Sequence, residues 1–569
     1  MTITKDIPTD LIAAAKALAA RTKGVDPADL IARTDDGLSL GPIYPAATAT
    51  SGLRSNAWSV YQRIDATDPD AAAIAIAISG GARGVTLVSV PDDWPAFLRR
   101  LPFETFDIRI DTSVVPAVDN DLSAILVDSG QLQNIVSVVH DPVTAVAIGD
   151  APRMAPTEAF DAFLKVSTAI TAHEAFGFTI VADGRPWHNA GASEAQEFAA
   201  VLGSVVAYLR HAESRGADLE KIAHQLGVML AADCDQFVTI AKFRAARLLL
   251  ARLAEVLALP VDAISIHAET GWRMMCRRDP YLNLLRMTTA TLAAAAGGAA
   301  SITTLPYDLR ASPFADRMAR NLQTVARDEA ALNRVADPGA GSGAVEALTD
   351  EIASAAWTAF QQLETEGGLL ASIEAGAVQK RIAEMAAQRR DRVARREIEI
   401  VGVNTHVDRT VPLPPPVDAP SEANTGARTL HPERLAEPFE RLCDRAATMA
   451  ETGVRPAVFV AALDGADTGP TSDALATFGL TVLDEGRVDG TQELIARFAQ
   501  SGAKAAAIIA GNDAVDIAAT VTALRDAGAA FVVVAGDAEV PGADATLGPT
   551  TDLPALGSRI LDAIVAAPN

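Results

Sequence analysis

The sequence predicts an α/β protein with two domains, a large (β/α)8 barrel followed by a smaller doubly wound parallel sheet. Three observations lead to this fold class. The chain has 569 residues, enough for more than one domain of ordinary size. A proline-rich stretch divides it into two unequal parts, and on both sides short apolar runs alternate with helical patterns. Such runs are typical of strands that are buried on both faces of a parallel sheet.

The charge balance excludes several classes of function. The chain has 48 Lys and Arg against 72 Asp and Glu, a formal net charge of −24. We therefore expect neither nucleic-acid binding nor a polybasic membrane anchor, since both need clustered cations. There is no run of about 18 apolar residues, and charges interrupt Met1–Gly24, so we expect no transmembrane helix, no signal peptide and a cytoplasmic location.

The cysteines and histidines form no metal-binding pattern. Cys234, Cys276 and Cys443 contain no C-x-x-C pair, and the eight histidines are scattered without an H-E-x-x-H or H-x-H motif. An odd, sparse set of cysteines is typical of a reducing compartment. We expect no disulfide framework and no metal site.

The boundary between the two parts lies in the proline-rich stretch. Three consecutive prolines, Pro414–Pro416, neither continue a helix nor enter a central strand. We expect a barrel over residues 46–403, a Pro-rich linker over 404–430 and a second domain over 431–569.

The second domain alternates regularly between strands and helices. Apolar runs predict strands at 457–463, 480–483, 505–510, 531–534 and 545–547, and helical spacing predicts helices near 469–478, 492–500, 513–526 and 553–566. Five β-α units in about 115 residues indicate a doubly wound, flavodoxin-like sheet.

The first domain alternates as well, with longer helices. Strand candidates are Ala57–Val60, Gly84–Val90, Phe106–Asp111, Val143–Ile148, Phe178–Val181, Ile264–His267 and Ile302–Leu305, and helices are expected at 193–214 and 344–366. Seven or eight strands with crossover helices over about 350 residues indicate a TIM barrel with insertions.

Two glycine-containing loops invite a ligand-binding interpretation. Gly339–Gly343 follows Asp337-Pro338 and not a strand, and it lacks G-K-[ST], so a flexible connection is favoured over a phosphate loop. The loop Asp464–Gly469 follows the first strand of the second domain, where open parallel sheets bind ligands. Asp and Gly are also ordinary turn residues, so the composition of this loop leaves both readings open.

Several segments in a fixed order carry a family resemblance. They are Thr34–Tyr44, Ala190–Glu197, Asp235–Arg247, Gly271-Trp272 with Asp279–Asn283, Arg317–Asn321, Arg334–Pro338 and Val401–Asn404. Together they resemble the adenosylcobalamin-dependent acyl-CoA mutases, specifically the methylmalonyl-CoA mutase family. The resemblance implies an N-terminal interaction arm over residues 1–45 and a holoenzyme that converts (R)-methylmalonyl-CoA to succinyl-CoA.

The sequence departs from the family at the substrate site of the barrel. Catalytic chains carry a G-Y-H segment whose Tyr and His lie over the cofactor and bind substrate, and here Arg185 and Pro186 take those two positions. Proline has no side-chain donor with which to polarise a thioester carbonyl, so the resemblance implies no catalytic residue here. His188 falls two positions late and is expected to be structural. We further expect Trp187 to fill the site and Arg185 to pair with an acidic neighbour, because an unpaired buried guanidinium is costly.

The second domain departs from the family at its cofactor loop. Catalytic chains carry D-x-H-x-x-G, whose His is the lower cobalt ligand, and Ala466 stands in its place. The vestigial loop consists of Asp464, Gly465, Ala466, Asp467 and Gly469, and the altered neighbouring turns contain Gly511 and Gly536. The resemblance therefore implies that this chain binds neither cobalamin nor a metal.

This pattern of losses resembles the small (beta), catalytically silent subunit of heterodimeric mutases. The resemblance implies a large (alpha) catalytic subunit as partner, which would hold adenosylcobalamin. Two alternatives remain open: an acyl-CoA-binding or regulatory subunit, and a catalytic mutase for another acyl-CoA.

Overall fold

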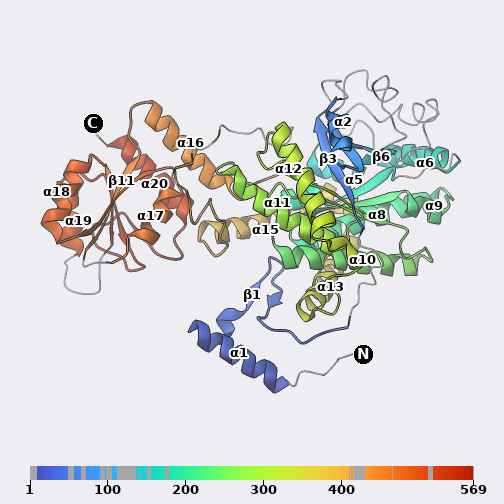
Figure 1. Ribbon diagram of the computed structural model, residues 1–569, viewed down its shortest axis with the longest axis horizontal. Helices are drawn as coiled ribbons and strands as arrows, with labels where there is room; N and C mark the ends of the chain where they lie inside the picture. Colours follow the sequence, from blue (N-terminus) through green and yellow to red (C-terminus); the bar gives the residue numbers. More distant parts are fainter. Residues whose placement is uncertain are drawn as a thin grey trace. The chain divides into compact units, whose positions relative to one another are not determined.

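The structure is a computed structural model, in which the chain forms two compact units. It describes residues 9–48, 57–65, 72–89, 97, 106–111, 136–139, 141–149, 156–172, 178–408, 410, 411, 414, 430–463, 466–509 and 517–567. The larger unit comprises Met1–Met274, Leu284–Ala386 and Asp418–Glu433, and the smaller comprises Met275–Asn283, Ala387–Val417 and Arg434–Asn569. Each unit contains its own parallel sheet (Figure 1).

The larger unit is built on a curled sheet of eight parallel strands. They are β3 (Ser59–Asp65), β4 (Gly84–Ser89), β5 (Asp107–Asp111), β6 (Val136–Val139), β7 (Ile180–Asp183), β8 (Leu226–Ala232), β9 (Ser265–Thr270) and β10 (Ser301–Thr303). Their spatial order is β6-β5-β4-β3-β10-β9-β8-β7. Strands β4, β5, β8 and β9 each pair with both of their chain neighbours, and β3, the first strand of the sheet, pairs with β10, the last. Ser301 of β10 lies opposite Ser59 of β3.

Helices follow the strands along the chain. Up to residue 394 they are α1 (Thr9–Lys23), α2 (Ala72–Ser79), α5 (Pro142–Ile148), α6 (Pro156–Ala172), α7 (Arg185–Asn189), α8 (Glu194–Ser214), α9 (Leu219–His224), α10 (Gln236–Val256), α11 (Pro280–Ala296), α12 (Pro313–Thr324), α13 (Gly343–Thr365), α14 (Leu369–Ala375) and α15 (Ala377–Ala394). A short antiparallel pair, β1 (Ala32–Arg33) and β2 (Ser39–Leu40), lies near the N-terminus. The helices predicted at 193–214 and 344–366 are confirmed as α8 and α13.

One of the sequence-based strand assignments fails in this unit, and two strands were not predicted. Val143–Ile148 was expected to be a strand and is helix α5, because the Asp141 side chain accepts the N–H groups of Val143 and Thr144 and thereby caps a helix that starts at Pro142. Strand β6, which precedes it, was not predicted. Strand β8 was not predicted, although every one of its residues is buried. A continuous apolar run has no periodicity with which to separate a buried strand from a buried helix.

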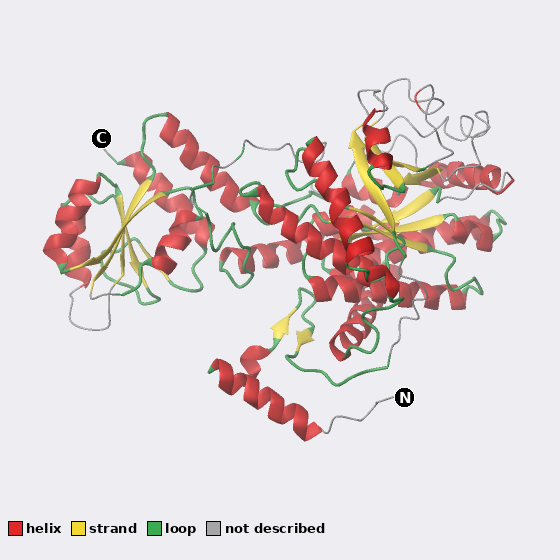
Figure 2. Cartoon of the chain, in the orientation of Figure 1, coloured by secondary structure: helices red, strands yellow, loops and turns green. Residues whose placement is uncertain are grey.

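The smaller unit is the predicted doubly wound sheet. Its strands are β11 (Ala457–Leu463), β12 (Thr481–Val488), β13 (Ala505–Ile509), β14 (Phe531–Ala535) and β15 (Ala545–Leu547), and its helices are α16 (Glu437–Glu451), α17 (Gly469–Ala476), α18 (Thr491–Ser501), α19 (Ile517–Asp526) and α20 (Leu553–Ala566). The order β12-β11-β13-β14-β15 is parallel throughout and corresponds to the flavodoxin-like order 2-1-3-4-5. One face of the sheet packs on α16, α17 and α20 and the other on α18 and α19 (Figure 2).

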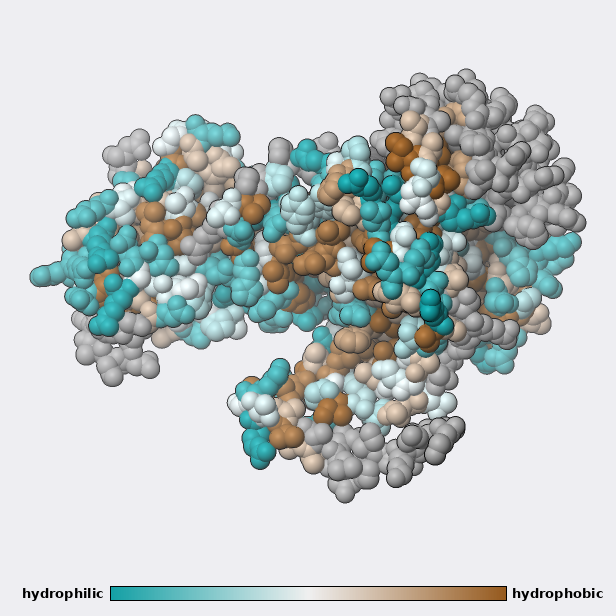
Figure 3. All heavy atoms as spheres, in the orientation of Figure 1, coloured by the Kyte–Doolittle hydropathy of each residue, from teal (hydrophilic) through white to brown (hydrophobic). Residues whose placement is uncertain are grey.

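Two features of the structure are relevant to membrane association: the hydropathy of its surface and the character of its helices. Figure 3 shows hydrophilic residues interspersed with hydrophobic ones over the face in view. Within the described part of the chain, no helix combines the length and apolar character needed to cross a bilayer.

Candidate functional site

The carboxyl ends of alternate strands in the larger unit carry a layer of charged side chains. Arg63 on β3, Asp111 on β5, Asp183 on β7 and Glu269 on β9 lie near the ends of their strands. Four side chains from alternate strands form one layer inside a (β/α)8 barrel. A charged layer at this end of the strands is therefore the natural candidate for a functional site.

Arg185, in the first turn of α7, reaches into this layer. Its Nη2 lies 2.8 Å from Asp183 Oδ2 and 3.1 Å from Asp111 Oδ2, and its Nη1 lies 3.1 Å from Glu269 Oε2. Nε donates to Asp183 as well, so all three guanidinium nitrogens face carboxylates. Arg63 Nη1 donates to the other oxygen of Glu269 at 2.8 Å.

The expectation that Arg185 pairs with acidic neighbours is confirmed. Its side chain is only 8% exposed. Burial alone would lower the pKa of Arg185, but Asp183, Glu269 and Asp111 raise it well above its usual value. Burial also raises the pKa of Asp183, against the opposing effect of Arg185. The guanidinium is held by the protein's own carboxylates, which already engage all three of its nitrogens.

Trp187 is fully buried, as a residue that fills the site must be, and its filling of the substrate site stays a prediction. Its Nε1 donates to Thr144 Oγ1 at 3.0 Å, and Thr144 Oγ1 donates to Asp141 at 2.7 Å. Pro186 lies at the start of the same short helix and supplies no donor. The three residues that follow Gly184 therefore contribute packing and internal ion pairs at the end of β7.

His188 is surrounded by charged side chains from α8, α10 and two loops. Its Nε2 lies 3.1 Å from Asp233 Oδ2, and its Nδ1 lies 3.3 Å from Glu197 Oε2 without hydrogen-bond geometry. Lys242 Nζ reaches the same Glu197 oxygen at 2.8 Å, and Arg273 Nη2 reaches Asp233 at 3.0 Å. Burial would raise the pKa of Glu197, but Lys242 and His188 lower it to about 2. These contacts support the expectation that His188 is structural.

A second polar layer lies below the first and was not predicted. Arg109 on β5 bonds through Nη2 to Ser301 Oγ at 2.6 Å and to His267 Nδ1 at 3.1 Å, and its guanidinium stacks on the Tyr61 ring, 3.7 Å from the centroid. Burial lowers the pKa of Arg109, and burial followed by Arg109 lowers the pKa of His267. The alternation in Asp107–Asp111 would have placed Arg109 on the same face as Asp111.

The N-terminal segment is attached to the larger unit at the start of α8. The Asp36 carboxylate accepts the Ser193 hydroxyl and the backbone N–H of Ala195. Burial, followed by the charge of Glu194, raises the pKa of Asp36 to about 6. A half-buried carboxylate at a helix N-terminus is favourably placed with respect to the helix dipole.

The Gly339–Gly343 loop also holds this segment. The Ala47 N–H donates to the Gly341 carbonyl, and a Cβ added at Gly343 would overlap the backbone carbonyl of Pro45. The loop therefore serves as a contact for the segment before residue 48.

The expected vestigial cofactor loop is described in part. Asp464, Gly465 and Gly511 lie outside the described residues. Ala466 is half-buried against the core between the sheet and α16, α17 and α20, and Asp467 Oδ1 accepts the N–H of Gly469 at 2.9 Å. Gly536, directly after β14, has a φ of 122° and open space at the position of a Cβ.

This loop does not fit a cobalt-bound cofactor. Ala466 presents a methyl group where a ligand would be needed, and no histidine follows His431 in the sequence. In the described ranges, no group of three or more His, Cys, Asp and Glu side chains is placed to hold a metal ion.

Comparison with known proteins identifies similar chains. The family model described as methylmalonyl-CoA mutase matches residues 67–477. The chain is 40% identical to a methylmalonyl-CoA mutase small subunit of Streptomyces virginiae, over 63% of this chain and 60% of that protein. It is 34% identical to a probable methylmalonyl-CoA mutase small subunit of Mycobacterium tuberculosis, over 84% of this chain and 80% of that one. A large subunit of Porphyromonas gingivalis is 32% identical, over 45% of this chain and 36% of its own length.

Proposed function

Because the chain belongs to the methylmalonyl-CoA mutase family, we propose that it is the small subunit of a heterodimeric methylmalonyl-CoA mutase. Its partner is a large subunit that binds adenosylcobalamin and converts (R)-methylmalonyl-CoA to succinyl-CoA. The cofactor supplies the radical for that rearrangement from within the large subunit. The chain described here is catalytically silent and stabilises the large subunit.

The proposal includes the architecture of both units. The curled sheet closes as a TIM barrel between β6 and β7, and the smaller unit is a cobalamin-binding-type domain that has lost its cofactor. Two features support the closed barrel: the cyclic order of the strands and the layer of four side chains from alternate strands.

One observation carries the silent role, namely the arrangement of Arg185. The family's catalytic chains place substrate-binding Tyr and His at the positions of Arg185 and Pro186. Here the guanidinium nitrogens face Asp183, Asp111 and Glu269, and a guanidinium engaged by these carboxylates is not placed to stabilise developing charge on a substrate.

The test is co-purification of this chain with the large subunit. Each chain is also purified alone, and the cobalamin absorbance of all three preparations is recorded. We expect cobalamin in the complex and in the large subunit, and none in this chain. Stoichiometric cobalamin in this chain alone would contradict the proposal.

A second measurement addresses catalysis directly. Trp187→Phe keeps most of the buried volume and removes one hydrogen bond, and Arg185→Lys keeps the charge. If the chain is silent, complexes with either variant retain wild-type turnover per bound cobalamin, like the control Arg210→Met on the exposed face of α8. A loss of turnover of about tenfold in an intact complex would favour a catalytic chain.

A further inference from the structure

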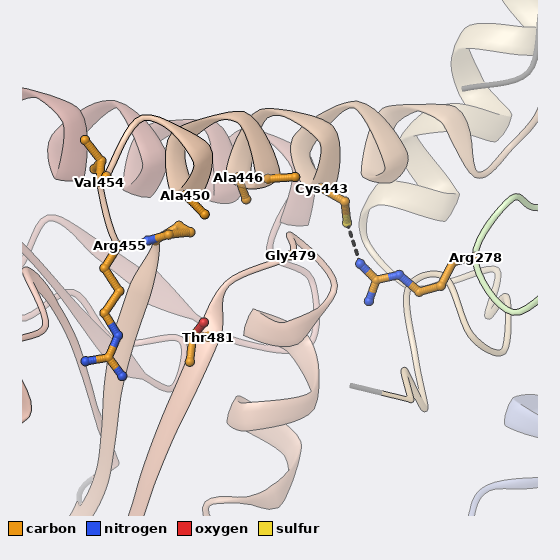
Figure 4. Close-up of a pocket in the computed structure, with 11 residues that line it drawn as sticks. Arg278, Cys443, Ala446, Ala450, Val454, Arg455, Gly479 and Thr481 are labelled. Carbon is orange, nitrogen blue, oxygen red and sulfur yellow. Dashed lines mark hydrogen bonds between the residues drawn. The ribbon is translucent and has the colours of Figure 1, made fainter. Parts of the chain in front are cut away.

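A pocket of about 400 Å³ lies within the smaller unit, at the amino edge of its sheet (Figure 4). Helix α16 forms one wall, and the start of β12, at Thr481, forms another. Arg455 lies just before β11 at one end, and Arg278 reaches toward Cys443 of α16 at the other. The loop with Ala466 follows β11, at the opposite edge of the sheet. The pocket is thus distinct from the vestigial cofactor loop.

The charge of this pocket is opposite to that of the chain. Two arginines and no acidic residue line it, in a chain with 72 acidic residues and a net charge of −24. The nearby carboxylates belong to other pairs, since Asp444 is bound by Arg277 and Glu440 by Arg434. Local positive charge in a cavity attracts anions.

Arg278 is available to a ligand. Its Nη2 lies 2.8 Å from Cys443 Sγ, and among the described residues it forms no ion pair. Burial raises the pKa of the Cys443 thiol, so the group beside the guanidinium is neutral near pH 7. A half-buried guanidinium whose neighbour is a neutral thiol retains most of its hydrogen-bonding capacity for an incoming anion.

The remaining walls are apolar and small. They are formed by Ala446, Ala447, Ala450, Val454 and Pro456. A volume of this size falls within the range of small-molecule sites, which combine apolar walls with a few placed polar groups.

We propose that this pocket binds a small amphipathic anion, with its carboxylate or other acidic group at Arg278 and its apolar part against the alanines of α16. The proposal concerns the smaller unit alone and does not depend on the role of the chain in a mutase.

The test uses two fluorescent probes that differ in charge. Dansylglycine has an aromatic body and a carboxylate, and dansylamide has the same body without the charge. Both are titrated into the full-length chain, and the dansyl emission is followed. We expect dansylglycine to saturate one site, and dansylamide to bind about tenfold more weakly or worse, because hydrogen bonds to charged groups are worth more than neutral ones.

Three variants locate the site. Arg278→Gln should weaken dansylglycine binding about tenfold or more, and Ala450→Phe should abolish it by filling the pocket. Arg487→Gln, an exposed arginine on β12 outside the pocket, should change nothing. Near-ultraviolet circular dichroism verifies that each variant is folded.

The proposal is overturned if dansylglycine shows no saturable binding up to about 1 mM, the weak end of specific affinities. It is equally overturned if dansylamide binds as well as dansylglycine, or if both Arg278→Gln and Ala450→Phe bind like the wild type.

Discussion

The Nζ atom of Lys242 on α10 lies 2.8 Å from Oε2 of Glu197 on α8, and neither side chain is exposed to solvent. The other carboxylate oxygen of Glu197 accepts the backbone N–H of Ala231 on β8 at 2.9 Å. One buried carboxylate thus ties two helices to a strand, and Lys242 is the largest influence that keeps it charged.

Removal of that lysine should destabilise the larger unit strongly. Lys242→Met leaves a buried carboxylate without its cation, and we expect a loss of about 3–5 kcal/mol in the free energy of unfolding. The double variant Lys242→Met/Glu197→Gln should recover much of the loss. Urea unfolding followed by tryptophan fluorescence measures both. The exposed pair Arg252–Glu255 is the control, where Arg252→Met should cost less than about 1 kcal/mol. Equal costs at the two pairs would refute a role for burial.

The attachment of the N-terminal segment should depend on pH. Burial raises the pKa of Asp36 from 3.8 to about 6. The folded chain then binds this proton more tightly than the unfolded chain, so the buried charge destabilises the fold above about pH 6. That destabilisation is relieved as the pH falls toward about 4.

The variant Asp36→Asn isolates this effect. Relative to it, the wild type should lose up to about 3 kcal/mol of stability between about pH 4 and pH 7. Urea midpoints measured across this range give the difference. Asp218→Asn removes a more exposed helix-capping carboxylate and serves as the control. Parallel pH profiles for wild type and Asp36→Asn would show that the pKa of Asp36 is not raised by its surroundings.

The contact between the glycine loop and the N-terminal segment should be sensitive to one methyl group. A Cβ at Gly343 overlaps the Pro45 carbonyl, so Gly343→Ala must displace the segment. We expect faster proteolysis before residue 48 with little change in the melting temperature. Gly41→Ala adds a methyl that only reaches ordinary contact with Tyr44, 3.9 Å away, and should behave like the wild type. Identical cleavage rates for both variants would mean that this segment is not held by the loop.

Restoration of a histidine should not restore cofactor binding. Ala466→His supplies a nitrogen, but Ala466 packs against the core, and the sequence still departs from the catalytic chains at Gly511 and Ala535. We expect no cobalamin absorbance after gel filtration of this variant, as for the size control Ala466→Gln. Stoichiometric cobalamin in the histidine variant, but not in the glutamine variant, would show that the domain lacks only the histidine that coordinates cobalt.

The sequence predicts the smaller unit better than the larger one. Its strands are apolar runs between clear turns, and 457–463 and 545–547 match β11 and β15 residue for residue. In the larger unit, Asp141 and Pro142 were a helix-start pattern that the apolar residues after them concealed. The local sequence pattern could not reveal β8, because a strand that is buried on both faces lacks the alternation of apolar and polar residues.

The contacts of the candidate site could also be predicted only in part. The need of Arg185 for acidic partners follows from burial and could be predicted. The identity of two of those partners could not, because Asp111 and Glu269 lie on strands far away in the chain. The contact between Arg109 on β5 and His267 on β9 could not be predicted either, because these two residues are also far apart in the chain.

The pairing of β3 with β10 has a consequence for biosynthesis. Ser59 is synthesised long before its partner Ser301, so one edge of β3 stays unpaired while the intervening strands emerge from the ribosome. Formation of such a distant contact is slow, and an open strand edge is a site of misassociation. The first half of the sheet should therefore remain an incomplete intermediate until residue 303 has left the ribosomal tunnel. During that time it should need protection by chaperones.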